Sequence, residues 1–341
     1  MRSTEPSHDE VRTVCARLLP EFNLKVVDAV ARRQSVYRIE STAGERLALK
    51  LFAYSGERGS SPESLNTEAV SLTELHRLGC PVPRLVAAER ELSALAMEWI
   101  DGETLELRLQ RSPLVEAEST AVLRSLAAME TAYQGLTVRH DPALAAAAHR
   151  ELIARTRHEL AALAALADNP LADIVSADRD RWAEIFETAA TAVTAGPWSY
   201  GSLDCSASNL LLAEGGAFVL DLSILGAEWR ERRTVRYAVA TGIGRSDGGY
   251  ASLFNQETAA QYATLVAGEE SAAVIAGRLD LNHVLVLLGA LARSTDSPDA
   301  PASRRRRQSL LNLARRPLTP GGIAGALRNL IPADVLEWDN S

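Results

Sequence analysis

The hydrophobic pattern of the chain changes once, near Asp101-Gly102, and this change limits the folds that the chain can adopt. Before it, alternating or β-branched segments predict strands, and helical spacing of apolar residues predicts helices over 11–19 and 63–78. After it, helical spacing dominates. The strand-like segments cover 25–30, 35–40, 46–52, 84–88 and 93–100, and the later helices cover 115–134, 143–167, 179–195 and most of the chain beyond 228. The sequence therefore predicts an α+β fold, in which an antiparallel sheet with one inserted helix precedes a mostly helical region.

A short hairpin interrupts the helical region and carries polar residues at its ends. Two β-like segments, 209–212 and 217–220, are joined by a glycine-containing turn. Asp204 lies on the loop before this hairpin, Asn209 begins its first strand and Asp221 ends its second, so we expect Asn209 and Asp221 to lie together. Their oxygen atoms suit Mg²⁺, which takes further ligands from water and phosphates. Asp204 is placed to accept a proton from an attacking hydroxyl group.

Lysine is rare in this chain, with Lys25 and Lys50 the two lysines among 36 strong cations. Lys50 lies in the third predicted strand, and Glu68, in the middle of the following helix, is the natural partner for its ammonium group. Transfer of a γ-phosphoryl group needs metal ligands, a carboxylate that orients the nucleophile and a cation on the phosphate oxygens. Lys50 supplies the cation in this scheme, and the hairpin region supplies the other parts.

The order of these residues resembles the aminoglycoside phosphotransferase and choline kinase family of the protein-kinase-like superfamily, over roughly residues 25–230. Four segments carry the resemblance: Glu68-Ala69-Val70-Ser71-Leu72 is similar to the family's helix, Pro81-Val82-Pro83 to the segment before its fourth strand, Glu98-Trp99-Ile100-Asp101-Gly102-Glu103 to its linker, and Ser202-Leu203-Asp204 to its His-Gly-Asp.

The resemblance implies a two-lobed kinase-like fold, with an N-terminal nucleotide-binding lobe over 1–100 and a helical C-terminal lobe over 101–341 that holds the catalytic loop, the metal site and the acceptor region. It implies an ATP-dependent, Mg²⁺-dependent small-molecule kinase that phosphorylates a hydroxyl group, in the manner of antibiotic-modifying phosphotransferases. The implied roles are a catalytic carboxylate at Asp204, Mg²⁺ ligands at Asn209 and Asp221, a phosphate contact at Lys50 oriented by Glu68, and adenine contacts on the backbone near Glu98 and Ile100.

Three segments depart from the family's pattern. The loop over 31–35 contains no glycine, so phosphate contacts there fall to Ser35 and to backbone amides. Ser202 replaces the usual histidine, and a shifted register would place Ser202 itself at the catalytic position, although the Asp-to-Asn spacing favours Asp204. The segment 226–233 stands where the family has a Gly-Asp-Pro motif followed by an aspartate.

Two alternatives compete with the small-molecule kinase. One is a pseudokinase that binds nucleotide or acts as a scaffold, motivated by the glycine-free loop and Ser202; the filled metal and base positions argue against it. The other is a protein kinase, which is disfavoured because no Ala-Pro-Glu-like segment follows Asp221.

The identity and charge of the acceptor stay open at this stage, as do the preference for ATP over GTP and the oligomeric state. Carboxylates at Asp247, Glu269 and Glu270 would suit a cationic aminoglycoside. An arginine cluster would instead suit an anionic acceptor, although a solvated helix face is the simpler interpretation of these residues. The cluster comprises Arg230, Arg232, Arg233 and Arg236.

Composition argues against several classes of partner. A net charge of −8 gives no global electrostatic basis for binding nucleic acid or an anionic membrane. The first ten residues lack the apolar core of a signal peptide, and no stretch approaches about 18 uncharged apolar residues. We therefore expect a cytoplasmic protein. The cysteines, Cys15, Cys80 and Cys205, lack metal-ligand spacing and predict neither a disulfide framework nor a zinc site.

Overall fold

The computed structural model describes residues 6–30, 35–52, 61–137, 141–165, 179–241, 249–292, 301–329 and 331. The chain divides into two compact units, one made of Met1–Gly102 and Ala213–Leu225 and the other of Glu103–Leu212 and Gly226–Ser341. The glycine-free segment 31–34 and Asp247 lie outside the described residues.

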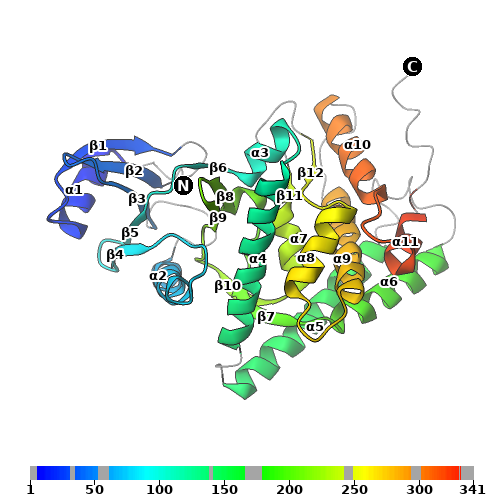
Figure 1. Cartoon of the computed structure of the whole chain (residues 1–341). Coiled ribbons are helices and arrows are strands. Elements are labelled where there is room, and N and C mark those ends of the chain that lie inside the picture. The colour runs from blue at the N-terminus through cyan, green and yellow to red at the C-terminus, as the bar shows by residue number, and fades with distance from the viewer. Residues whose placement is uncertain are drawn as a thin grey trace. The chain divides into compact units, whose positions relative to one another are not determined.

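The first unit is built on a five-stranded sheet in the order β1-β2-β3-β5-β4, and each neighbouring pair is antiparallel (Figure 1). Its strands are β1 (Leu24–Ala29), β2 (Val36–Ser41), β3 (Arg46–Leu51), β4 (Leu85–Glu89) and β5 (Ala94–Glu98). The predicted α+β class and antiparallel sheet are confirmed.

Alternation along β3 separates its apolar side chains from Lys50. Leu49 and Leu51 are buried in one core cluster together with Cys15 of α1 (His8–Leu18). Because successive side chains of a strand point to opposite faces, Lys50 leaves the other face of the sheet. There α2 (Pro62–Arg77) packs against β4 and β5.

Helix α2 begins and ends at residues suited to those positions. The side chain of Ser61 accepts a hydrogen bond from the Ser64 amide at 3.2 Å, and Pro62 occupies the first turn, where its missing N–H costs nothing. Gly79 follows the helix with φ 76°, a conformation that glycine adopts without strain. The buried stripe of α2 contains Glu68 as well as apolar side chains, namely Leu65, Leu72 and Leu75.

The second unit is mostly helical. Its helices are α3 (Leu105–Arg111), α4 (Glu116–Thr137), α5 (Pro142–Ala165), α6 (Arg179–Thr194), α7 (Arg230–Ala238), α8 (Gln256–Val266), α9 (Ala272–Ala292), α10 (Pro301–Arg315) and α11 (Gly322–Asn329). The remaining short strands of the chain are β6 (Gly102–Thr104), β7 (Trp198–Ser202), β8 (Leu210–Ala213), β9 (Gly216–Val219), β10 (Leu225–Trp229), β11 (Val239–Ala240) and β12 (Ala251–Ser252). Strand β7 pairs with β10, and β11 with β12.

Helix α9 forms the centre of the second unit and contacts α5, α6, α7, α8, α10 and α11. By length and composition Ala272–Leu291 is apolar enough to cross a membrane, the one such helix among the described residues, but 72% of the window is buried inside the protein. That burial is typical of the core helix of a helical domain.

The strands β6, β7, β10, β11 and β12 are absent from the sequence prediction, which expects only helices over 104–194 and beyond 228 and, between them, only the hairpin over 209–220. The longest of them has five residues and the shortest two. Segments of this length contain too few residues to show a hydrophobic period.

Candidate active site

Lys50 lies between two carboxylates of the first unit. Its Nζ donates to Glu68 Oε2 at 2.7 Å and to Asp221 Oδ1 at 2.9 Å. The Glu68 side chain is 1% exposed and that of Lys50 is 14% exposed. Burial alone would lower the pKa of Lys50, but the charges of Glu68 and Asp221 outweigh burial and raise it. Lys50 is therefore a fixed cation at neutral pH.

Asp221 reaches this site because the segment Ala213–Leu225 belongs to the first unit. The Val219 amide donates to the main-chain oxygen of Pro81 at 2.8 Å, which holds the end of β9 beside the segment before β4. Asp221 itself has φ 57°, in the left-handed region that few residues other than glycine adopt. Ser223 Oγ also donates to Asp221 Oδ1, at 2.7 Å. A costly backbone conformation thus directs this carboxylate to Lys50.

The second unit carries the loop that contains Asp204. Asn209 is 3% exposed, and its side-chain Nδ2 donates to the main-chain oxygen of Asp204 at 2.9 Å. The main-chain N–H of Asn209 donates to the main-chain oxygen of Ser206, also at 2.9 Å. A short 3-10 turn, η2 (Ala207–Asn209), brings the two residues to this distance. The hydrogen bond from the Asn209 side chain to Asp204 therefore closes a loop with four residues between its ends.

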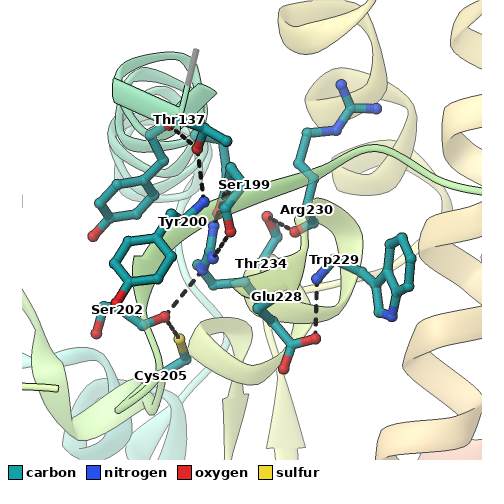
Figure 2. Close-up of polar contacts among 12 residues, drawn as sticks. Thr137, Ser199, Tyr200, Ser202, Cys205, Glu228, Trp229, Arg230 and Thr234 are labelled. Atoms are coloured by element: carbon teal, nitrogen blue, oxygen red, sulfur yellow. Dashed lines mark hydrogen bonds and ion pairs between the residues drawn. The ribbon is translucent and has the colours of Figure 1, made fainter. Parts of the chain in front are cut away.

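Arg233 of α7 holds the strand that leads into the same loop. Figure 2 shows Ser199 and Ser202 of that strand and Cys205 of the loop. The Arg233 side chain is fully buried, and Nε donates to the main-chain oxygen of Ser202 at 3.0 Å. Nη2 donates to Ser199 O at 2.8 Å, and Nη1 donates to Glu130 Oε2 at 2.9 Å. The guanidinium also lies 4.9 Å from the ring centroid of Tyr133. A buried ion pair from α4 and α7 thus supports the backbone two residues before Asp204.

The burial of Ser202 and Cys205 bears on which side chain of this loop can meet a substrate. Ser202 is 0% exposed, whereas Asp204 is partly exposed. Cys205 Sγ donates to Ser202 O at 3.0 Å, and burial raises the pKa of its thiol to about 12. These observations favour Asp204 over Ser202 as the reactive position and leave Cys205 as a packing residue.

The residues expected to contact the nucleotide lie at or next to the ends of strands in the first unit. Ser35 precedes β2 with φ 61°, and its main-chain oxygen accepts from the Leu51 amide at 2.8 Å, next to Lys50 in the register. Glu98 ends β5, and its amide donates to Arg84 O at 2.9 Å. Ile100 follows in the segment between β5 and β6.

The interpretation of the arginine cluster as a solvated helix face is wrong for two of its members, which are buried. Arg233 is 0% exposed and Arg230 is 6% exposed. Arg230 pairs with Glu231 at 2.5 Å, and Arg278 of α9 joins Glu231 at 3.1 Å, so packing of α7 against α9 buries these charges as pairs. The sequence prediction also missed Glu130 and Ser199, which lie 103 and 34 residues from Arg233 along the chain.

Two of the carboxylates suggested for a cationic acceptor lie together between α8 and α9, and one of them is already paired with arginine. Glu270 accepts from Arg278 at 2.5 Å, and these hydrogen bonds lower its pKa. Arg230 lies 3.4 Å from the same carboxylate. Glu269 is exposed in the turn between α8 and α9.

A cavity of about 770 Å³ lies in the second unit, between α5, α7 and α9. Cys205 and Ser206, directly after Asp204, form part of its wall. Its size is typical of pockets that hold small molecules, which range over roughly 300–1,000 Å³.

Comparison with known proteins places this geometry in context. Residues 27–232 match the profile of a family described as Phosphotransferase enzyme family. Comparison with functionally curated proteins finds no match.

Solved structures share the fold. The GDP complex of wild-type aminoglycoside 2'-phosphotransferase-IIIa is 11% identical, covers 90% of this chain and 98% of its own, and gives a TM-score of 0.56. Choline kinase from Cryptosporidium parvum is 11% identical, with coverage of 90% and 95% and a TM-score of 0.55. A ternary complex of APH(2")-IIa with streptomycin and ATP is 13% identical, with coverage of 91% and 97% and a TM-score of 0.52.

Proposed function

Because this chain belongs to the phosphotransferase enzyme family, we propose that it transfers the γ-phosphoryl group of ATP to a hydroxyl group of a small molecule. The observation that carries the proposal is the position of Lys50, a partly buried cation held at 2.7 Å by Glu68 and at 2.9 Å by Asp221. A cation fixed in this way stabilises phosphate oxygens without reorganising during the reaction.

Asp204 is the proposed catalytic residue. Its carboxylate orients the acceptor hydroxyl and accepts the hydroxyl proton while the oxygen attacks the γ-phosphorus, and ADP leaves. Arg233 is a positioning residue in this scheme, because it holds the backbone of the loop rather than the reacting atoms. Asn209 holds the same backbone through Nδ2 and has a second proposed role as a metal ligand.

Asn209 and Asp221 are the proposed Mg²⁺ ligands. One offers an amide oxygen and the other a carboxylate oxygen, a donor set that suits a hard cation. The nitrogen of the Asn209 carboxamide donates to Asp204 O, and the carboxamide oxygen is the proposed coordinating atom. When bound, the metal would neutralise charge on the phosphates.

The nucleotide is proposed to lie against the first unit. Ser35 and its neighbouring amides would contact the phosphates, and the backbone near Glu98 and Ile100 would receive the adenine. Solved relatives hold either GDP or ATP, so both nucleotides belong in the test.

A two-step experiment tests the proposal. Calorimetric titration with ATP and with GTP, each with and without MgCl₂, measures nucleotide binding. Transfer of labelled γ-phosphate to kanamycin, choline, sugars and apolar alcohols then measures the reaction. Asp204→Asn is expected to keep nucleotide affinity and to lower transfer by roughly 10²- to 10⁴-fold.

Asp141→Asn is the matched control. Asp141 is exposed at the start of α5, where it caps the Ala143 amide at 2.7 Å, and asparagine caps equally well. Nucleotide binding without transfer to any acceptor, unchanged by Asp204→Asn, would instead identify a pseudokinase. Phosphate found on an added protein, and on none of the small molecules, would identify a protein kinase.

A further inference from the structure

The cavity of the second unit has a predominantly apolar wall. Side chains from α5, from α6, from α9 and from the residue after α7 supply most of it, including Leu160, Leu163, Val193, Val239, Leu285 and Val286. Contact with such a wall releases water from the apolar surface of a ligand, whereas polar groups placed against its apolar side chains would lose hydration without gaining partners.

The charged side chains on this wall are cationic in balance. Among the described lining residues, Glu159 is the one carboxylate, and Arg232 forms an ion pair with it. Arg236 lies 3.6 Å from Glu228, beyond hydrogen-bond distance, and Glu228 is shared with Arg155 at 3.9 Å. Counted with these neighbours, three arginines share two glutamates. Among the described lining residues, Arg236 is the arginine whose carboxylate partner lies beyond hydrogen-bond distance, so its N–H groups can donate to an anion in the cavity.

The cationic side of the cavity adjoins the catalytic loop. Cys205 and Ser206 belong to the wall, and α7, which carries Arg236, contacts the η2 turn of the same loop. A ligand in the cavity that contacts Arg236 therefore lies beside the residues that follow Asp204.

We propose that this cavity binds the acceptor, and that the acceptor is an apolar molecule that carries one anionic group as well as a hydroxyl group. The inference rests on the proposed function. An anion gains charge-assisted hydrogen bonds from Arg236 in a partly desolvated site. A polycationic acceptor would meet arginine charges there, with the Glu159 carboxylate already paired.

Binding of matched acid and ester probes tests this chemistry without requiring turnover. The probes are cholate with methyl cholate and 6-hydroxy-2-naphthoate with its methyl ester, compared with kanamycin and choline by calorimetry at constant ionic strength. At least one acid is expected to bind roughly tenfold more tightly than its ester and more tightly than either amine.

Two pairs of variants locate the interaction. Arg236→Gln is expected to weaken the bound acid about tenfold and to leave its ester unchanged, while Arg236→Lys keeps the preference for the acid. The exposed Arg124 of α4 gives the control Arg124→Gln. Ala290→Phe, which adds a ring at the cavity wall, is expected to weaken acid and ester alike, whereas Ala273→Phe on the exposed part of α9 is not.

Several results of these binding experiments would overturn the inference. Tighter binding of kanamycin or choline, no binding of either acid, or equal loss for acid and ester in Arg236→Gln would do so. Phosphoryl transfer to kanamycin that survives Arg236→Gln would overturn the acceptor class while keeping the proposed function. Acid binding with no transfer to any acceptor would keep the cavity's chemistry and contradict the proposed function.

Discussion

Arg233 donates from Nε to the main-chain oxygen of Ser202 at 3.0 Å, and so links helix α7 to the loop that carries Asp204. The same guanidinium donates twice to Glu130, a side chain that is also buried. The position of the proposed catalytic loop therefore depends on one ion pair removed from water.

Removing one member of this pair is expected to destabilise the protein strongly. Arg233→Met leaves the Glu130 carboxylate buried without its cation, which costs about 3–5 kcal/mol of unfolding free energy. The double variant Arg233→Met/Glu130→Leu removes both charges and is expected to recover much of that loss, because an apolar pair of similar volume needs no compensation. Urea unfolding of the wild type, both single variants and the double variant measures the coupling.

The double variant also separates stability from positioning. Its fold is expected to recover, but the Ser202 carbonyl has then lost its donor, so phosphoryl transfer is expected to stay impaired at saturating nucleotide. Additive losses of stability in the double variant, or full transfer activity in it, would contradict this role for Arg233.

Gly201 is expected to tolerate no side chain. A Cβ atom there would lie 2.6 Å from the ring of Tyr133. Tyr133 is 2% exposed, and its ring also contacts the guanidinium of Arg233. Gly201→Ala is expected to cost about 1–3 kcal/mol of unfolding free energy, because the ring has no space into which to move.

Gly135→Ala is the matched control for this glycine. Gly135 lies in α4, and a Cβ atom there meets nothing within 4 Å. Since alanine favours the helix over glycine, the same substitution should stabilise the protein by about 0.5–1 kcal/mol. Thermal unfolding that moves in the same direction for both variants would be incompatible with the packing described.

Lys50 and Lys25 provide an internal comparison for the proposed phosphate contact. Lys50→Arg places a planar, larger cation between Glu68 and Asp221, and we expect kcat/KM to fall on the order of 100-fold. Lys25 is 61% exposed and lies 3.9 Å from Glu40, so Lys25→Arg should leave kinetics unchanged. Equal activity of the two variants in the phosphate-transfer assay would remove Lys50 from the proposed site.

The pairing of Lys50 with Glu68 was predictable because local periodicity determines both side chains. Alternation in β3 puts Lys50 on the face opposite Leu49, and helical spacing puts Glu68 on the stripe that contains Leu65 and Leu72. The contact between Asp204 and Asn209 was also predictable from local sequence, because the two residues are only five positions apart and the hydrogen bond between them closes a single loop.

The support for that loop was not predictable in the same way. Arg233 and Glu130 are 103 residues apart, and no local pattern specifies that α4 and α7 meet. The cluster itself gave no indication of burial. At about 100° per residue its four arginines fall within roughly 160° of the helix circumference, which is also the arrangement of a solvated face.

A buried histidine in α9 is expected to make stability depend on pH. His283 is 1% exposed, its Nε2 lies 3.0 Å from Ser252 Oγ, and burial lowers its pKa to about 4. In the unfolded chain its pKa is about 6.5. Between these two pKa values the unfolded chain binds a proton that the folded protein does not, so stability is complete above about pH 6.5 and falls as the pH drops toward 4. The difference between the two pKa values corresponds to a loss of about 3 kcal/mol of unfolding free energy at most.

Urea unfolding at pH 7, 6 and 5 measures this dependence. The free energy of unfolding should decline less for His283→Gln, which cannot titrate, than for the wild type. Parallel declines for the two proteins would assign the pH dependence to other groups.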